Sequence, residues 1–270
     1  MKVLSWGCGV QSTTLAVMSA LGDLEPLDAV INADTGWERA LTYEMRDFYT
    51  AWLRERGVRV EIVTYGNVQT DGISPNWRLP FWTGTGAPLR RQCTGIFKIV
   101  PVKQRVRELA GFDQSKAPHP KPGSVEMWIG FSLDEWTRIK ESRVKFIAHR
   151  WPLIEQKMTR QDCKDYLVER GLPVPPKSAC IGCPYRPASE WIVMRNTAPD
   201  EFAEAMAFDE ANRRNPGVVR ANSTAKEDEI FIYSHGGALA DADLELDAAR
   251  ERSREHFQIP FICESGYCWT

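Results

Sequence analysis

Two segments of this 270-residue sequence combine residue types and spacings that suit chemistry. The first is a glycine loop near the N-terminus, LSWGCGVQSTT (4–14), in which an apolar run leads into two glycines and then into hydroxyl residues. The second is SACIGCPYR (178–186), where Cys180 and Cys183 form a C-x-x-C pair. A glycine loop between a strand and a helix offers backbone N–H groups to an anion. A C-x-x-C pair lets two thiolates face one metal ion.

Two common phosphate-binding loops do not fit the first segment. The dinucleotide fingerprint needs a third glycine, and Ser12 follows Gly9 where that glycine would stand. The Walker loop needs a lysine before a hydroxyl residue, and this loop has none. Two interpretations remain: a phosphate loop of the form Ser5-x-Gly7-x-Gly9-x-Gln11-Ser12, and a plain strand-to-helix turn.

The elements that would position these segments alternate from the first residues onward. Hydrophobic patterns predict helices after the loop, at 40–56, at 98–110 and from Thr159. Strands are expected at 2–5, 28–36, 58–66, 125–132 and within 144–153. This alternation predicts an α/β fold with a doubly wound, mostly parallel five-stranded sheet. Ligands bind at the carboxyl ends of such strands, where the glycine loop and Asp34 would lie.

Composition limits the class of protein. The formal net charge of -2 argues against general adhesion to nucleic acid or membrane. No apolar run approaches the roughly 18 residues of a membrane span, and no basic and apolar leader precedes the first strand. We therefore expect a cytoplasmic protein without membrane contact. In that compartment the seven cysteines are expected to serve as metal ligands or catalytic thiols rather than disulfides.

The motifs, taken in their order, resemble one family. The loop is similar to the PP-loop of ATP pyrophosphatases, S-x-G-x-D-S, and ADTGWE (33–38) is similar to a D-T-G-x-x-x-E stretch of phosphoadenylyl-sulfate reductases. RQCTGIFKIVP (91–101) resembles their R-x-C-C-x-x-x-K-x-x-P, with Thr94 in place of the second cysteine. IGFSLDEWTRIKESR (129–143) resembles their G-x-R-x-x-x-S-x-x-R. The chain thus resembles the phosphoadenylyl-sulfate reductase-like branch of the PP-loop superfamily, which also includes sulfur-transfer ATP pyrophosphatases.

This resemblance implies a nucleotide site that holds ATP with Mg²⁺. The residues expected to cradle the terminal phosphates of ATP, or the phosphosulfate of an adenylyl sulfate, are Ser5, Gly7, Gly9, Gln11 and Ser12. Asp34 and Gly36 would lie near the adenosine, and Gly130 would let the backbone approach the nucleotide. The predicted catalytic residues are Gln11, Arg91, Lys98 and Arg138. Of these, Arg91, Lys98 or Arg138 would neutralise charge on the phosphates. Gln11 stands where the family carries Asp, which removes a charge that could help to hold Mg²⁺.

The resemblance also implies a [4Fe-4S] cluster, with zinc as the alternative metal. Its predicted ligands are Cys93, Cys180 and Cys183, with Cys163 as the fourth. Two other interpretations stay open: Cys163 is a buried helix cysteine, and the cluster has three cysteines and one open iron. The tail cysteines, Cys263 and Cys268, would form a second metal half-site, relay sulfur or pack locally.

The predicted domains are a PP-loop nucleotide-binding α/β domain at 1–155 and a helical, cysteine-bearing subdomain at 156–270. Six basic and no acidic residues lie between Arg90 and Arg107. Together with NWRLPFWTG (76–84), this run would either take a nucleic-acid strand, stacked on Trp77 or Trp82, or cover the nucleotide.

Three functions follow from the motifs. The first is an ATP-dependent sulfur transfer enzyme that adenylylates an acceptor, with nucleic acid as one candidate, for thiolation by a sulfur nucleophile at the cysteine cluster. Its sulfur donor would be a protein such as a cysteine desulfurase or a thioredoxin. The second is a reductase of phosphoadenylyl sulfate or adenylyl sulfate. The third is a non-catalytic nucleotide-sensing subunit with a structural metal.

Overall fold

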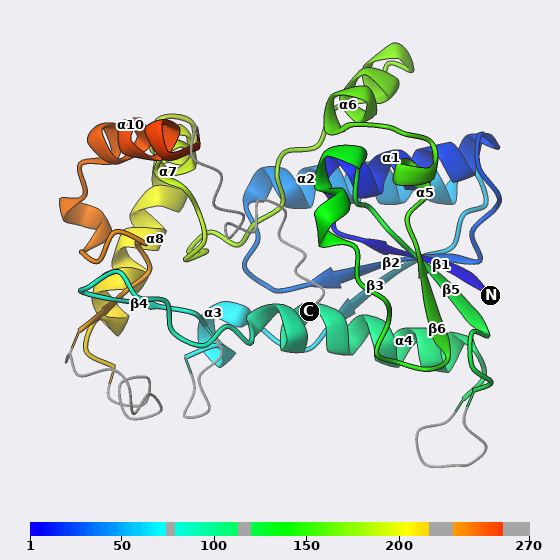
Figure 1. The fold of residues 1–270 in the computed structure, drawn as a ribbon, viewed down its shortest axis with the longest axis horizontal. Coiled ribbons are helices and arrows are strands. Elements are labelled where there is room, and N and C mark those ends of the chain that lie inside the picture. The colour runs from blue at the N-terminus through cyan, green and yellow to red at the C-terminus, as the bar shows by residue number, and fades with distance from the viewer. Residues whose placement is uncertain (74–78, 113–119, 216–228, 256–270) are drawn as a thin grey trace.

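The computed structural model describes residues 1–73, 79–112, 120–215 and 229–255. Its main sheet has five parallel strands in the order β3-β2-β1-β5-β6 (Figure 1). Their bounds are Lys2–Trp6 (β1), Ala29–Asp34 (β2), Val60–Thr64 (β3), Val125–Ile129 (β5) and Ile147–Arg150 (β6). Each lies within one residue of its predicted range or inside it, so the predicted α/β fold is confirmed.

Helices cover both faces of this sheet. One face carries α1 (Val10–Leu21), α2 (Ala40–Arg54), α5 (Pro152–Glu155) and α6 (Arg160–Glu169), and the other carries α4 (Val100–Leu109) (Figure 1). The strand residues alternate between the two cores. Leu4 of β1 packs with α1, α2 and α6, whereas Val3 packs with Val102 and Val106 of α4. Burial on both faces explains why apolar residues predominate in β1 and β2.

A third core belongs to the C-terminal helices. It joins α7 (Ala188–Thr197), α8 (Pro199–Asn212) and α10 (Leu244–Glu255) to the short 3-10 helix η3 (Leu239–Asp241). A two-stranded antiparallel sheet of β4 (Trp82–Thr83) and β7 (Ile230–Phe231) adds to it, as does α3 (Val68–Asp71). The cores therefore do not divide at residue 155: residues 79–97 join the C-terminal core, whereas α6 packs on α1 and joins the core of the main sheet.

Two short helices lie beside the ends of strands. The π-helix η1 (Thr94–Ile99) runs directly into α4, and the 3-10 helix η2 (Leu133–Arg138) follows β5. The chain passes from β1 outward to β2 and β3, then returns to the other side of β1 as β5. The edge of the sheet at the carboxyl ends of β1 and β5 is thus the topological switch point, and ligands of such sheets bind at this kind of position.

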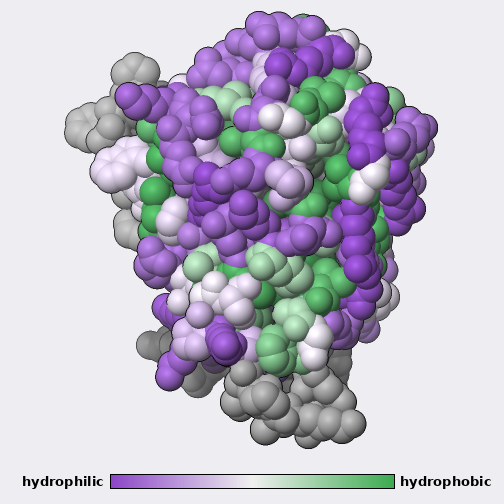
Figure 2. Space-filling model, turned by 90° about the vertical axis from the view of Figure 1, so that its right-hand side faces the viewer, coloured by the Kyte–Doolittle hydropathy of each residue, from purple (hydrophilic) through white to green (hydrophobic). Residues whose placement is uncertain are grey.

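The described helices include none that is both long and apolar enough to cross a membrane. Figure 2 shows the face on the right-hand side of Figure 1, where hydrophobic residues are interspersed among hydrophilic ones.

Candidate functional site

The predicted phosphate loop lies between the end of β1 at Trp6 and the start of α1 at Val10. Gly9 is the N-cap of α1 and has no side chain to cover the first N–H groups of the helix. The Ser12 hydroxyl accepts a hydrogen bond from Gly7 N (3.2 Å) and donates one to Gly9 O (3.3 Å). The loop therefore turns back on itself around Ser12, and it presents the positive end of the helix dipole to an anion.

Cys8 occupies the tightest point of this loop. Its φ of 56° lies in the left-handed region, which is unusual for a residue other than glycine. The Asn32 side-chain amide donates to Cys8 Sγ (3.2 Å) and to Trp6 O (2.9 Å), and so ties the loop to β2. Burial raises the pKa of Cys8 well above its ordinary value, and Glu38 adds to the rise. Cys8 is therefore a protonated, space-filling thiol at neutral pH.

The segment after β5 docks directly on the phosphate loop. A side chain at Gly130 would place its Cβ 2.8 Å from Ser12 N, so only glycine allows the two backbones to come this close. Gln11 is 6% exposed, and its side-chain amide donates to Glu135 Oε2 (3.0 Å) and to Ser132 Oγ (3.4 Å). Arg138 in turn pairs with Glu135. Gly130 was predicted to let the backbone approach the nucleotide. In the structure the close approach at Gly130 is instead to Ser12 of the phosphate loop.

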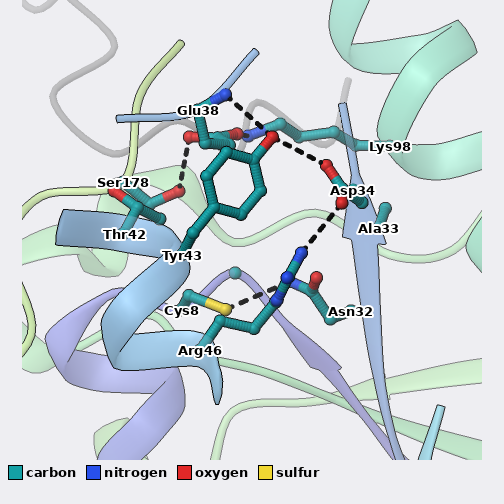
Figure 3. Close-up of a pocket in the computed structure, with 11 residues that line it drawn as sticks. Cys8, Asn32, Ala33, Asp34, Glu38, Thr42, Tyr43, Arg46, Lys98 and Ser178 are labelled. Atoms are coloured by element: carbon teal, nitrogen blue, oxygen red, sulfur yellow. Dashed lines mark hydrogen bonds and ion pairs between the residues drawn. The ribbon is translucent and has the colours of Figure 1, made fainter. Parts of the chain in front are cut away.

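The loop after β2 holds Asp34 in a network of donors. Its carboxylate accepts from Gly36 N (2.7 Å), from the Tyr43 hydroxyl (3.0 Å) and from Arg46 Nη1 (2.8 Å). Figure 3 shows the Tyr43 and Arg46 side chains reaching Asp34 from the same helix, α2. Gly36 has a φ of 73°, a conformation that glycine adopts without strain.

A buried ion pair lies next to this network and was not predicted from the sequence. Lys98 Nζ is 2.9 Å from Glu38 Oε1, and the two side chains are only 8% and 7% exposed. Hydroxyl groups of Thr35 (3.2 Å) and Ser178 (3.3 Å) also donate to the Glu38 carboxylate. Lys98, predicted to contact phosphate, therefore neutralises a carboxylate of the same chain.

Lys98 lies on the π-helix η1, in which its side chain is buried. The segment ends just before Pro101, which has no N–H to continue an α-helical ladder. A wider π turn accommodates this break, and such turns are frequent at functional sites.

These elements enclose one small pocket, drawn in Figure 3. It lies between the phosphate loop and the segment that leads to the C-x-x-C pair, because Ser178 forms part of its wall. The lining residues are Gly7, Cys8, Asn32, Ala33, Asp34, Glu38, Thr42, Tyr43, Arg46, Lys98 and Ser178.

The C-x-x-C pair is joined to the loop after β2 by backbone contacts. Glu38 and Cys180 form an isolated antiparallel bridge, and Ile181 N donates to Trp37 O (2.9 Å). The Cys180 thiol lies 3.4 Å from the Thr35 hydroxyl and 4.0 Å from Glu38 Oε1. The segment that carries the C-x-x-C pair and the loop after β2 are therefore neighbours in the fold.

Three of the predicted metal ligands, Cys93, Cys180 and Cys183, lie near one another. Burial raises the pKa of Cys180, and both Glu38 and Cys183 add to the rise. Burial likewise raises the pKa of Cys93, where Cys183 acts against the lowering effect of Arg91. Cys183 thus neighbours both other thiols. We call these three residues the thiol cluster.

Cys163 lies elsewhere. It is fully buried on α6 in the core beneath α1, where the Thr14 hydroxyl donates to its carbonyl oxygen (3.2 Å). The thiol cluster borders the separate core of the C-terminal helices. The structure therefore does not bring Cys163 to the other cysteines, and its position matches the alternative of a buried helix cysteine.

The donor set does not complete the implied metal site. Among the residues that the structure describes, no three His, Cys, Asp or Glu side chains are arranged to hold a metal ion. A closed tetrahedral site takes four ligands, and the thiol cluster supplies three sulfurs. Cys263 and Cys268 lie outside the described residues. Neither the [4Fe-4S] cluster nor zinc is thus supported by the described side chains.

The position of Cys163 leads to a labelling prediction. Burial raises its pKa to about 12, so the thiolate that reacts with iodoacetamide is scarce at pH 8. We expect Cys163 to resist alkylation in the native protein and to react fully in denaturant, as measured by peptide mass spectrometry. Rapid native labelling of Cys163 would show that it is accessible and would reopen its role as a ligand.

The basic run from Arg90 to Arg107 divides between two environments. Arg91 lies at the thiol cluster, where it donates to the Thr94 hydroxyl (2.8 Å) and stacks over the Tyr185 ring. Arg105 lies on α4 and pairs with Glu61 and Glu108.

Of the two tryptophans predicted to stack on bases, Trp77 and Trp82, the structure describes Trp82. The Trp82 indole donates to Pro184 O (2.7 Å) and packs edge-on against Tyr185. It therefore covers the residues that directly follow Cys183. Trp77 lies outside the described residues.

No family model matches the sequence, and no curated protein matches it. Among solved structures, the chain is similar to a phosphoadenylyl-sulfate (PAPS) reductase from Candida auris in a phosphate complex. The two are 15% identical, with a TM-score of 0.40, and the match covers 64% of this chain and 74% of that chain. At this identity the similarity concerns the fold alone.

Proposed function

We propose that this chain is an ATP-dependent sulfur transfer enzyme that adenylylates an acceptor and then thiolates it. One observation carries the proposal: a single pocket connects the phosphate loop, through Gly7 and Cys8, to Ser178, two residues before Cys180 of the thiol cluster. The phosphate loop and the thiol cluster therefore lie on either side of one pocket, which supports a reaction that uses both.

The proposed reaction has two steps. An acceptor oxygen attacks the α-phosphorus of ATP, and pyrophosphate leaves toward the loop and the N-terminus of α1. A thiol reductant cleaves the persulfide of the donor protein at the thiol cluster and releases hydrosulfide. The hydrosulfide then attacks the acceptor carbon, the carbon–oxygen bond breaks, and AMP leaves with that oxygen as the carbon–sulfur bond forms. The residues of this chain position the reactants and neutralise charge, which suits phosphoryl chemistry because it needs little covalent help from the protein. Mg²⁺ would accompany ATP, with phosphate oxygens among its ligands.

Two variants separate the steps. Ser12→Ala removes both hydrogen bonds that shape the loop, so we expect it to abolish pyrophosphate release. Cys180→Ser keeps the loop and removes a sulfur, so we expect it to retain pyrophosphate release and to lose thiolation. The measurement incubates anaerobically purified protein with ATP and RNA or DNA fragments, then quantifies pyrophosphate and determines the mass of the product.

Other outcomes would favour the alternatives. Sulfite release from an adenylyl sulfate in the presence of thioredoxin would favour a reductase. ATP binding without pyrophosphate release, with every tested acceptor and a sulfur donor such as a cysteine desulfurase present, would favour a sensing subunit. Iron, sulfide and zinc are measured in the same preparations, because an iron–sulfur protein is coloured and a zinc protein is not. Absence of both pyrophosphate and thiolated product under all conditions would refute the proposal.

A further inference from the structure

The first turn of α1 is supported by a carboxylate from another part of the chain. Its own residues, Val10 to Thr13, include no acid, and Glu135 reaches it from η2, across 124 positions of sequence. The contact is specific, because Gln11 Nε2 lies 3.0 Å from Glu135 Oε2 and Gln11 is 94% buried.

Glu135 also holds a cation at the same place. Its other oxygen, Oε1, pairs with Arg138, whose guanidinium stacks over the Phe131 ring at 4.6 Å. An isolated carboxylate here would repel phosphate, but the pair with Arg138 has no net charge. Glu135 can therefore orient both neighbours without adding repulsion.

The backbone around Glu135 is adapted to this contact. Glu135 has φ -111° and ψ 16°, outside helical geometry, at a kink within η2. Gly130, a few residues earlier, brings the same segment against Ser12 of the phosphate loop. The segment 130–138 and the loop thus form one unit at the switch point of the sheet.

We propose that Glu135 is a positioning residue for the phosphates of the nucleotide. Through Gln11 it fixes the first turn of α1, and through Arg138 it holds a cation beside that turn. This inference rests on the proposed function, because it requires that ATP binds at the loop.

The test exchanges the two partners. Glu135→Ala removes both contacts, and Gln11→Glu places two carboxylates against each other. We expect each to weaken ATP binding by at least about tenfold. The double variant Gln11→Glu/Glu135→Gln again pairs one carboxylate with one amide, but it takes the carboxylate away from Arg138. We therefore expect it to recover only part of the affinity that Gln11→Glu loses. Calorimetric titration measures affinity for ATP and for adenosine, and the exposed Glu169→Gln serves as the matched control.

The outcomes separate this inference from the proposed function. Positioning of phosphates predicts that adenosine affinity stays within about twofold of the wild type in every variant, whereas a merely structural role would weaken both ligands together. The inference is overturned if Glu135→Ala binds ATP like the wild type, if ATP and adenosine weaken equally, or if the double variant shows no recovery. If the wild-type protein itself binds no ATP, the proposed function fails as well.

Discussion

Lys98→Met is expected to lower the free energy of unfolding by about 3–5 kcal/mol, because it leaves the Glu38 carboxylate buried without its cation. Both side chains are more than nine-tenths buried and 2.9 Å apart. The same change should abolish pyrophosphate release, since Glu38 lies in the wall of the pocket. Denaturant unfolding measures the first effect, and a pyrophosphate assay measures the second.

Two further variants test the cause of this loss. Glu38→Gln/Lys98→Met removes both charges and should regain much of the lost stability, because no uncompensated charge remains. Lys2→Met removes a lysine from an exposed ion pair with Glu25 and should change stability by less than about 1 kcal/mol. If Lys98→Met is no more destabilising than Lys2→Met, the buried pair does not stabilise the fold.

Gly130→Ala is expected to weaken ATP binding by about 5- to 150-fold. The added Cβ would lie 2.8 Å from Ser12 N and 2.9 Å from Ser12 Cα, and backbone atoms cannot move aside as a side chain can. Overpacking of this kind costs about 1–3 kcal/mol, which gives the stated range of affinity. Calorimetric titration with ATP measures the change.

The control for this variant is Gly237→Ala, because a Cβ at Gly237 meets no atom within 4 Å. It should bind ATP like the wild-type protein. Wild-type affinity in Gly130→Ala would mean that the segment after β5 shifts freely and does not shape the phosphate loop.

The sheet could be predicted because its information is local. Buried parallel strands are short apolar runs, and the helices between them carry an apolar stripe. The strand at 2–5 and the helix at 40–56 could therefore be predicted from the sequence alone. The phosphate loop was visible for the same reason: its glycines and hydroxyl residues are consecutive.

The partners within the site could not be predicted, because distant segments supply them. Glu38 and Lys98 are 60 positions apart, and Gln11 and Glu135 are 124 apart. Cys163 shows the opposite case, in which residues close in sequence are far apart in the fold. It stands close to the C-x-x-C pair in sequence, but α6 turns it into the core beneath α1. Pro101 is a local signal that could have indicated the irregular helix η1, on which Lys98 lies.

The pocket also sets an order of events during synthesis. Glu38 is made early, its cation follows 60 positions later, and its Ser178 partner follows 140 positions later. Domains fold from the N-terminus as the chain emerges, so the first strands would form while this carboxylate is still in water. The pocket closes only when the segment that carries the C-x-x-C pair has been made. An incomplete chain would therefore carry the phosphate loop without the complete wall of this pocket.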